Sequence, residues 1–430
     1  MRDRYELIDT KLKRVFWAWH FWAGLIATPV LVVLSITGGI YVFKPQLERW
    51  WYADIAAARF EILDLQLDAA VDQVEALVGE EHAIYGFELE SDTGRAPAVL
   101  TISQDGHYSV RRFFFHPDTQ QIRGEIPEPN FFTVTLDLHR RLAVGTLGRV
   151  LTELTTCWTV SIMLLGLVLW WPKNLRRLGG IFWPRIRSKR YVQLRDLHAV
   201  GGALAAPLLL IIAVTGLLYA LVWGGVFFGA GLLAGQFDVK LSPPQSTSDE
   251  SKPTLSANEI LARMHALEMP TDRVSIHMPM VPTDPISIES GHHWGASVSR
   301  IVFLDRASGK LLLDRGLSEL PPMAVYTQWN YPLHVGSVMG LGSQILWLIA
   351  SVLMAALPVL GVAMWLVRRK RGRTGFPKRG DAIKPAWLVA AMTLLGILLP
   401  TAGISMLLVW ACLTGSSRVR GRAAKAATSS

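Results

Sequence analysis

The sequence contains only two cysteines, Cys157 and Cys412, among 430 residues. Both lie inside long apolar stretches, which excludes a disulfide framework and a Cys-x-x-Cys thiol site. The sequence has no Cys-x-x-Cys-His motif, so any haem must be held without a covalent bond. No Gly-x-Gly-x-x-Gly motif follows a strand and opens a helix, so the sequence predicts no nicotinamide-binding site.

Charged residues are also scarce, at 18% of the chain, whereas 51% of the residues are hydrophobic and the mean hydropathy is +0.31. This composition is typical of an integral membrane protein. A membrane-spanning helix needs about 20 apolar residues. The sequence predicts five such spans, near 17–43, 140–171, 198–228, 334–367 and 386–413.

The distribution of lysine and arginine predicts the orientation of the spans. The segments 2–14, 172–196 and 368–384 are strongly basic, so we expect them, and the N-terminus, in the cytoplasm. The acid-rich segment 44–138 and the mildly acidic segment 229–333 are expected outside. The net charge of +9 is therefore a topology signal and does not indicate a nucleic-acid partner.

The last predicted span conflicts with this orientation. A fifth crossing places the basic residues of the C-terminal tail outside. Either a late helix with a short tail departs from the rule, or 386–413 is a re-entrant hairpin broken at Pro400. The predicted division of the chain is 1–43 (N-terminus and first span), 44–138 (outside), 139–171 (second span), 172–197 (basic loop), 198–228 (third span), 229–333 (outside), 334–367 (fourth span), 368–385 (basic loop), 386–413 (fifth helix) and 414–430 (tail).

The membrane part of the chain is a tandem repeat. At an offset of 178, the sequence matches His20 with His198, Gly24 with Gly202, Pro29 with Pro207, Thr37 with Thr215, Gly38 with Gly216 and Tyr41 with Tyr219. At an offset of 195, it matches His139 with His334, Gly145 with Gly340, Gly166 with Gly361 and Trp170 with Trp365.

The repeated histidines form two pairs by depth. His20 and His198 lie near the cytoplasmic end of their spans, and His139 and His334 open theirs at the outer face. Two facing imidazoles are the ligand set of a bis-histidine haem, so the pattern predicts two b-type haems in a four-helix bundle. The alternative is that each histidine only tolerates the headgroup region.

Residues beside the histidines suit a flat macrocycle. Gly24 and Gly202 lie one turn past His20 and His198 and leave room on that face. Close helix packing is the alternative, and it is compatible with the first role. Arg140 and Arg141 follow His139 directly and can meet haem propionates, or can snorkel at a helix end. Arg195 takes the matching place before His198.

Two charged residues interrupt the second span. Arg149 and Glu153 have the i, i+4 spacing of an ion pair on one helix face. A carboxylate inside a membrane is a functional candidate, so Glu153 can tune a haem potential or relay a proton. A structural pair is the alternative.

Each repeat carries an outside segment that resembles a small α+β domain. The first segment predicts a helix at 68–79 and strands at 84–90, 97–103 and 107–115. The second predicts a helix at 255–266 and strands near 273–279, 285–289, 298–304 and 310–314. Residues 241–254 have the composition of a linker.

These motifs together resemble the PepSY-associated transmembrane family. The resemblance covers nearly the whole chain and is carried by His20-x-x-x-Gly24 ending in Thr37-Gly38, the hairpin Phe303-x-Asp305-x-x-x-Gly309-x-Leu311, Leu138-His139 and Trp170-Trp171-Pro172. It implies a mainly α membrane protein of the bacterial inner membrane, with a four-helix haem-binding bundle, a fifth helix and two small extracytoplasmic PepSY-like domains.

The family includes inner-membrane di-haem siderophore reductases. The resemblance therefore implies an oxidoreductase that passes electrons from a cytoplasmic or quinol donor to a ferric siderophore of the hydroxamate type outside. Two other classes stay open. The outer domains can make the chain a membrane-anchored binding or regulatory protein, and the repeat can belong to a transporter. A general electron carrier with another acceptor is a further alternative.

Overall fold

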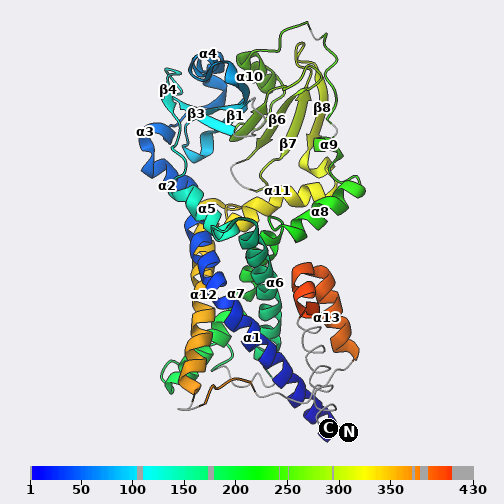
Figure 1. The fold of residues 1–430 in the computed structure, drawn as a ribbon. Coiled ribbons are helices and arrows are strands. Elements are labelled where there is room, and N and C mark those ends of the chain that lie inside the picture. Colours follow the sequence, from blue (N-terminus) through cyan, green and yellow to red (C-terminus); the bar gives the residue numbers. More distant parts are fainter. Residues whose placement is uncertain are drawn as a thin grey trace, which may run out of the picture. The chain divides into compact units, whose positions relative to one another are not determined.

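The computed structural model describes residues 2–103, 110–172, 179–241, 243–249, 251–292, 295–369, 373–377 and 386–408. The chain divides into two compact units. A helical unit contains Met1–Gly39, Asp137–Phe228 and Leu348–Ser430, and a sheet unit contains Ile40–Leu136 and Gly229–Trp347. Figure 1 shows the elements of both units, which are described separately below.

Four helices in the described part of the chain are long and apolar enough to cross a membrane. They are Leu12–Val42 within α1 (Arg2–Val42), α6 (Gly145–Trp170), α7 (Arg190–Leu217) and α12 (Gly340–Arg368). Large apolar side chains stay exposed on them, such as Ile26 at 75% and Leu204 at 60%. An apolar surface of this kind is suited to lipid, so the chain is a membrane protein.

The second and fourth spans begin later than the sequence predicts. His139 lies in a separate helix, α5 (Phe131–Arg141), and His334 lies in α11 (Pro322–Val335). Each short helix is followed by a glycine with positive φ, Gly145 at 62° and Gly340 at 61°, where the spanning helix begins. Because this conformation ends a helix, the predicted spans 140–171 and 334–367 were wrong at their outer ends.

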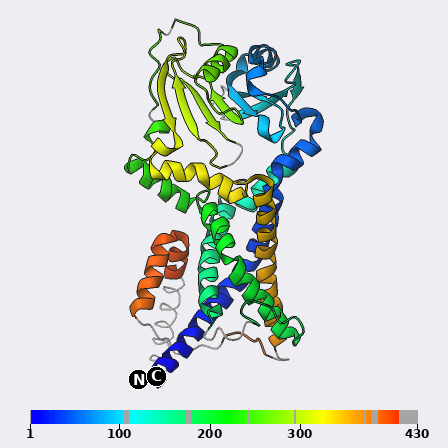
Figure 2. The same cartoon turned by 180° about the vertical axis from the view of Figure 1, so that it is seen from behind.

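The third and fifth predicted spans are also corrected. The third ends at Leu217, and 222–233 forms a separate helix, α8 (Val222–Leu233). In the fifth region, α13 (Ala386–Leu398) is followed by a bend at Leu399 and a second helical segment, 400–408. Gly403 packs directly on the backbone of Gly396, so the two segments run back along each other (Figures 1 and 2). The break at Pro400 favours the hairpin alternative, and residues 409–413 lie outside the described part.

The sheet unit contains one antiparallel sheet in the order β4-β3-β2-β1-β5-β6-β7-β8. The sequence predicted two separate outer domains, but β1 pairs with β5 from Gly86 opposite His277 to Glu90 opposite Arg273. Pairing removes the open edge that each half-sheet would otherwise expose. The strands are β1 (His82–Glu90), β2 (Ala98–Ser103), β3 (Val110–Phe115), β4 (Ile122–Gly124), β5 (Arg273–His277), β6 (Ile286–Gly291), β7 (Arg300–Leu304) and β8 (Leu311–Gly316).

Two helices at the predicted positions pack together on the sheet, α4 (Leu67–Val78) and α10 (Ala257–Ala266). Their apolar faces join the strands in one core that includes Leu67, Val74, Ile260, Phe87 and Ile276, each fully buried. Shorter helices complete the described elements: α2 (Lys44–Trp51), α3 (Ala53–Ala56), α9 (Asp238–Leu241), η1 (Ile62–Asp64), η2 (Gly79–Glu81), η3 (Ser91–Thr93) and η4 (Leu317–Glu319).

The turn between the last two strands of each half has the same geometry. The Asp305 amide donates to the Lys310 carbonyl at 2.8 Å, and the His116 amide donates to the Gln121 carbonyl at 2.9 Å. Asp305 is fully buried and accepts hydrogen bonds from Ser246, Thr247, Ser248 and Ser308. The predicted linker 241–254 is thus tied to this turn, and the tandem repeat extends into the sheet unit.

Candidate functional site

The helical unit contains a cavity of about 470 Å³ between α1, α6, α7 and α12. Its walls are mainly apolar, with side chains such as Leu31, Met163, Leu209 and Met354. Cofactor pockets in proteins are typically about 300–1,000 Å³, mostly apolar, with a few placed polar groups. The cavity therefore has the size and lining of a cofactor site.

His20 from α1 and His198 from α7 both line this cavity. Their ring centroids lie 6.0 Å apart, and the ring planes are nearly perpendicular at 86°. The sequence paired these residues by the offset of 178, and the structure brings them together. The repeat supplies the reason, because equivalent positions on two equivalent helices face each other across one bundle.

The second ring nitrogen of each histidine is fixed by a helix carbonyl. The Nδ1 atom of His20 lies 3.0 Å from the carbonyl oxygen of Ile162, and that of His198 lies 2.8 Å from the carbonyl oxygen of Leu357. A carbonyl only accepts hydrogen bonds, so each Nδ1 carries the proton and donates. Each Nε2 then keeps its lone pair. An imidazole that ligates a metal through Nε2 needs this tautomer.

Glycines make these two hydrogen bonds possible. Gly166 and Gly361 lie four residues after Ile162 and Leu357 on the same helix face. A Cβ atom at Gly166 would lie 3.1 Å from the Cε1 atom of His20. A Cβ atom at Gly361 would lie 3.6 Å from the Cε1 atom of His198. The sequence repeat contained both glycines, but nothing in the spacing showed that they uncover a carbonyl for an imidazole.

Gly24 and Gly202, which the sequence placed beside the macrocycle, also line the cavity. A Cβ atom at Gly24 would meet nothing within 4 Å. A Cβ atom at Gly202 would lie 3.6 Å from the side chain of Leu357. The space beside both residues is consistent with the predicted role, and neither glycine is required by close contact between helices.

His139 repeats the same pattern in the helical unit. Its Nδ1 atom lies 3.0 Å from the carbonyl oxygen of Leu34 and 3.1 Å from the hydroxyl of Thr37. Gly38 lies four residues after Leu34, and a Cβ atom there would be 2.9 Å from the Cε1 atom of His139. His334 belongs to the sheet unit, so its pairing with His139 stays a prediction from the repeat.

The predicted propionate partners differ in their surroundings. Arg140 and Arg141 are both exposed, and Arg141 pairs with Asp137 at 3.6 Å. Arg195 lines the cavity together with Tyr191, one turn before it on α7. The buried carboxylate of Asp196 holds the Arg195 guanidinium at 2.6 Å. Of these three arginines, Arg195 is thus the one that lines the cavity between α1, α6, α7 and α12.

The predicted pairing of Arg149 with Glu153 is wrong. The buried Glu153 carboxylate accepts hydrogen bonds from the backbone amides of Val222 at 2.8 Å and Trp223 at 3.0 Å. These amides open α8, where the helix dipole favours a negative charge. Tertiary packing brings a better partner than the i, i+4 guanidinium, so Glu153 acts as a helix cap.

The histidine geometry fits a haem iron. An imidazole binds a metal at roughly 2 Å, so two axial imidazoles place their ring centroids roughly 6 Å apart. The observed 6.0 Å meets this requirement. Among the described residues, no three His, Cys, Asp or Glu side chains gather at one place to hold a metal ion.

Four apolar helices, an antiparallel sheet unit and a cavity with two facing imidazoles define a helical membrane protein with a cofactor-sized site. Comparison with known families gives a more specific assignment. The PepSY-associated TM region matches residues 17–368, which is well over half of the chain. The chain therefore belongs to this family. A comparison with curated proteins finds no match.

Proposed function

We propose that the protein carries electrons across the bacterial inner membrane through two b-type haems. His20 and His198 would hold the inner haem, and His139 and His334 the outer haem. Electrons would enter from a cytoplasmic or quinol donor and leave to a ferric siderophore outside. The chain would thus act as a ferric-siderophore oxidoreductase in iron uptake.

One observation carries this proposal. His20 and His198 face each other across an apolar cavity, and each Nδ1 is fixed by a helix carbonyl so that Nε2 is available. An interfacial histidine that only tolerated the headgroups would need neither a facing imidazole nor a glycine beside its ring. The same carbonyl and glycine arrangement at His139 supports a second site of the same kind.

The residues that line the cavity favour electron transfer at a bound haem over the binding of a further ligand to its iron. His20 and His198 would both hold the group through its iron, and apolar side chains such as Leu31 and Met354 would keep water out. A bound haem supplies one-electron chemistry at the iron. Arg195 and Tyr191 would bind its propionates at the cavity edge, because charge-assisted hydrogen bonds to carboxylates are strong.

The acceptor follows from the family resemblance and from coordination chemistry. Hydroxamate chelators hold Fe³⁺ far more tightly than Fe²⁺, because hard anionic oxygens prefer the more highly charged ion. One electron from the protein therefore releases the iron. A non-siderophore acceptor, or a binding role for the sheet unit with the helices as anchors, are the competing functions.

Haem content tests the cofactor. We expect about two b-type haems per chain by the pyridine haemochrome assay and a reduced-minus-oxidised b-type spectrum. His20→Ala and His198→Ala should remove the same spectral component, and His139→Ala and His334→Ala should remove the other. A value near zero haem favours the anchored binding protein. Loss of one component by both His20→Ala and His139→Ala refutes the pairing.

Reoxidation tests the acceptor. Chemically reduced protein in detergent should be reoxidised by a ferric hydroxamate siderophore, with ferrous iron captured by a chelator. His334→Ala should abolish this reoxidation and leave the inner component reducible. If several ferric siderophores leave the protein reduced while oxygen or a quinone oxidises it, the general electron carrier is the better assignment.

A further inference from the structure

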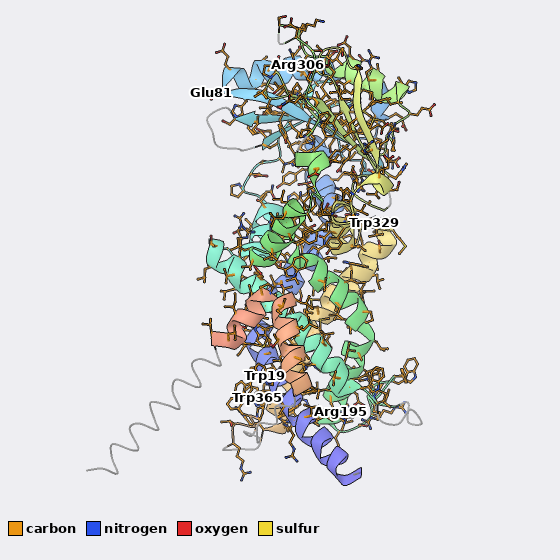
Figure 3. The ribbon with its side chains drawn as sticks, turned by 90° about the vertical axis from the view of Figure 1, so that its right-hand side faces the viewer. Trp19, Glu81, Arg195, Arg306, Trp329 and Trp365 are labelled. Atoms are coloured by element: carbon orange, nitrogen blue, oxygen red, sulfur yellow. The ribbon has the colours of Figure 1, made fainter. Side chains whose placement is uncertain are left out.

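Four arginines either line the cavity of the helical unit or contact residues at its wall. Arg195 lines the cavity, and Arg185 shares the carboxylate of Asp196 with it. The Arg368 guanidinium lies 4.7 Å from the ring centroid of Trp17, and that of Arg369 lies 5.9 Å from the ring centroid of Trp365. Both tryptophans also line the cavity. We call Arg185, Arg195, Arg368 and Arg369 the arginine rim (Figure 3 labels Arg195 and Trp365).

The rim is held in place and is positively charged. Asp196 is fully buried and bonds Arg185 at 2.7 Å and Arg195 at 2.6 Å. The side chains of these two arginines nonetheless stay 45% and 44% exposed. Arg368 also donates to the carbonyl of Gly375 at 3.1 Å. Two of the four cations thus share the carboxylate of Asp196, and the side chains of all four are exposed.

An aromatic surface lies beside the rim. Phe376 stacks on Trp365 with centroids 5.5 Å apart and packs on Trp22 with centroids 4.7 Å apart. The Trp365 indole donates to the carbonyl of Thr374 at 2.9 Å, which folds residues 373–377 over the ring. Phe376 is 39% exposed. Aromatic side chains next to arginines are typical of protein interfaces.

Membrane topology alone does not explain these features. The positive-inside rule counts lysine and arginine alike and requires no fixed geometry. Here each member of the rim is anchored to Asp196 or to an aromatic ring of the cavity wall. A fixed guanidinium fork matches carboxylates, whereas lysine does not offer this geometry.

We infer that the arginine rim docks a small, acidic, soluble electron-transfer protein, the donor to the His20/His198 site. This inference rests on the proposed function, which needs a donor because the sequence predicts no nicotinamide-binding site. Docking places the partner's redox group against the Trp17 and Trp365 side of the cavity. One electron moves from the partner to the inner centre; the partner is oxidised, the centre is reduced, and no bond is made.

Binding tests the inference without requiring haem. Oxidised flavodoxin, a small acidic flavoprotein, serves as the probe for the full-length protein in nanodiscs of zwitterionic lipid. We expect saturable binding that weakens about tenfold or more between low salt and physiological salt, because a contact between opposite charges is screened. Basic cytochrome c should not bind. Arg368→Gln with Arg369→Gln should weaken binding about tenfold, whereas Arg315→Gln, on β8 of the sheet unit, should not.

Three results would overturn the inference. Flavodoxin does not bind, its binding does not depend on salt concentration, or the double variant and Arg315→Gln bind it with equal affinity. Anionic lipid that abolishes binding when included in the nanodisc would assign the rim to headgroups instead. Stopped-flow reduction adds a second arm: inner-centre reduction by a neutral quinol but not by reduced flavodoxin also refutes it. Protein without haem would refute the proposed function, while the binding result would still stand.

Discussion

At the scale of residues, three histidines share one local arrangement, in which the ring is held by a helix carbonyl next to a glycine. The Nδ1 atoms of His20, His198 and His139 each form a hydrogen bond with a backbone carbonyl oxygen of a neighbouring helix. In each case the ring lies against the glycine four residues after that carbonyl. Glycine in a helix interior costs about 1 kcal/mol relative to alanine. That cost is offset because the imidazole reaches its acceptor and takes a fixed tautomer.

Replacing Gly166 or Gly361 by alanine should have different effects at the two equivalent positions. Gly166→Ala places Cβ 3.1 Å from the His20 ring, so the ring must shift, at a cost of about 1–3 kcal/mol for overpacking. Gly361→Ala places Cβ 3.6 Å from the His198 ring, which is ordinary contact. We expect lower occupancy and a shifted midpoint potential of the proposed inner haem for Gly166→Ala only. Equal behaviour of the two variants in spectroscopic titrations would argue against a positioning role for Gly166.

Asp305 is a fully buried carboxylate of the sheet unit that accepts several hydrogen bonds. Burial opposes its ionisation, but hydrogen bonds from Ser248 and Ser308 outweigh burial and hold the pKa of Asp305 well below its usual range. A depressed pKa stabilises the fold above the unfolded value of about 3.9, and this contribution is lost as the pH falls.

Asp305→Asn should therefore lower the stability of the sheet unit by about 1–3 kcal/mol at neutral pH, because the amide turns a donor toward groups that donate to it. Thermal unfolding and hydrogen exchange of residues 243–249 measure the effect. The matched control is Asp118→Asn, whose side chain is 87% exposed in the turn of the other half. The difference from wild type should shrink toward pH 3. A difference that grows on acidification would contradict the depressed pKa.

At the scale of elements, backbone conformation and helix capping set the ends of the helices. Gly145 and Gly340 open α6 and α12 with positive φ. Glu153, inside α6, caps a different helix, because its carboxylate meets the first amides of α8. A helix N-terminus has unpaired amides, and inside a membrane water does not satisfy them readily. The cap thus supports the sharp turn between α7 and α8.

Charge removal at Glu153 should loosen α8. Glu153→Gln keeps one acceptor oxygen but loses the favourable interaction with the helix dipole, a cost of about 1–2 kcal/mol. Hydrogen exchange at residues 222–228 should quicken in this variant. Arg149→Gln should leave that exchange rate near the wild-type value. A stronger effect of Arg149→Gln would restore the i, i+4 pair that the sequence suggested.

At the scale of the whole molecule, the C-terminal hairpin removes a conflict in the topology. The hairpin packs on the helical unit through polar contacts, including Trp158 with Ser405 at 3.1 Å and Trp223 with the carbonyl of Leu398 at 3.0 Å. A chain that turns back at Pro400 returns to the face from which it entered. For such a hairpin, the charge rule predicts that the basic C-terminal residues lie on the same side as the other basic segments.

Cysteine labelling can test this topology because the chain has so few cysteines. In a background with Cys157→Ala and Cys412→Ala, Ser430→Cys and Ser188→Cys should react with a membrane-impermeant maleimide only after spheroplasts are opened. Thr247→Cys should react in intact spheroplasts. Labelling of Ser430→Cys from outside would show a fifth crossing and reject the hairpin.

Local sequence patterns predicted much of the fold. The helix at 68–79, the helix at 255–266 and the strands match α4, α10 and the observed strands within a few residues, because hydrophobic period and turn residues act locally. The pairing of His20 with His198 was also predictable, because a repeat in sequence becomes a repeat in space. The pairing of β1 with β5 was not predictable. The alternation of apolar and polar residues in each strand is the same whether or not the strand pairs with the other half.

The sequence by itself determined the membrane class, the family, the tandem repeat and the histidines that face the cavity. Composition and periodicity carry those features, and neither depends on contacts between distant residues. Only the tertiary structure decided that Gly166 and Gly361 uncover carbonyls for His20 and His198, and that Glu153 caps α8 instead of pairing with Arg149. It also decided that Arg368 and Arg369 lie over rings of the cavity wall. These outcomes depend on which of several competing partners a side chain meets, and packing between helices sets that choice.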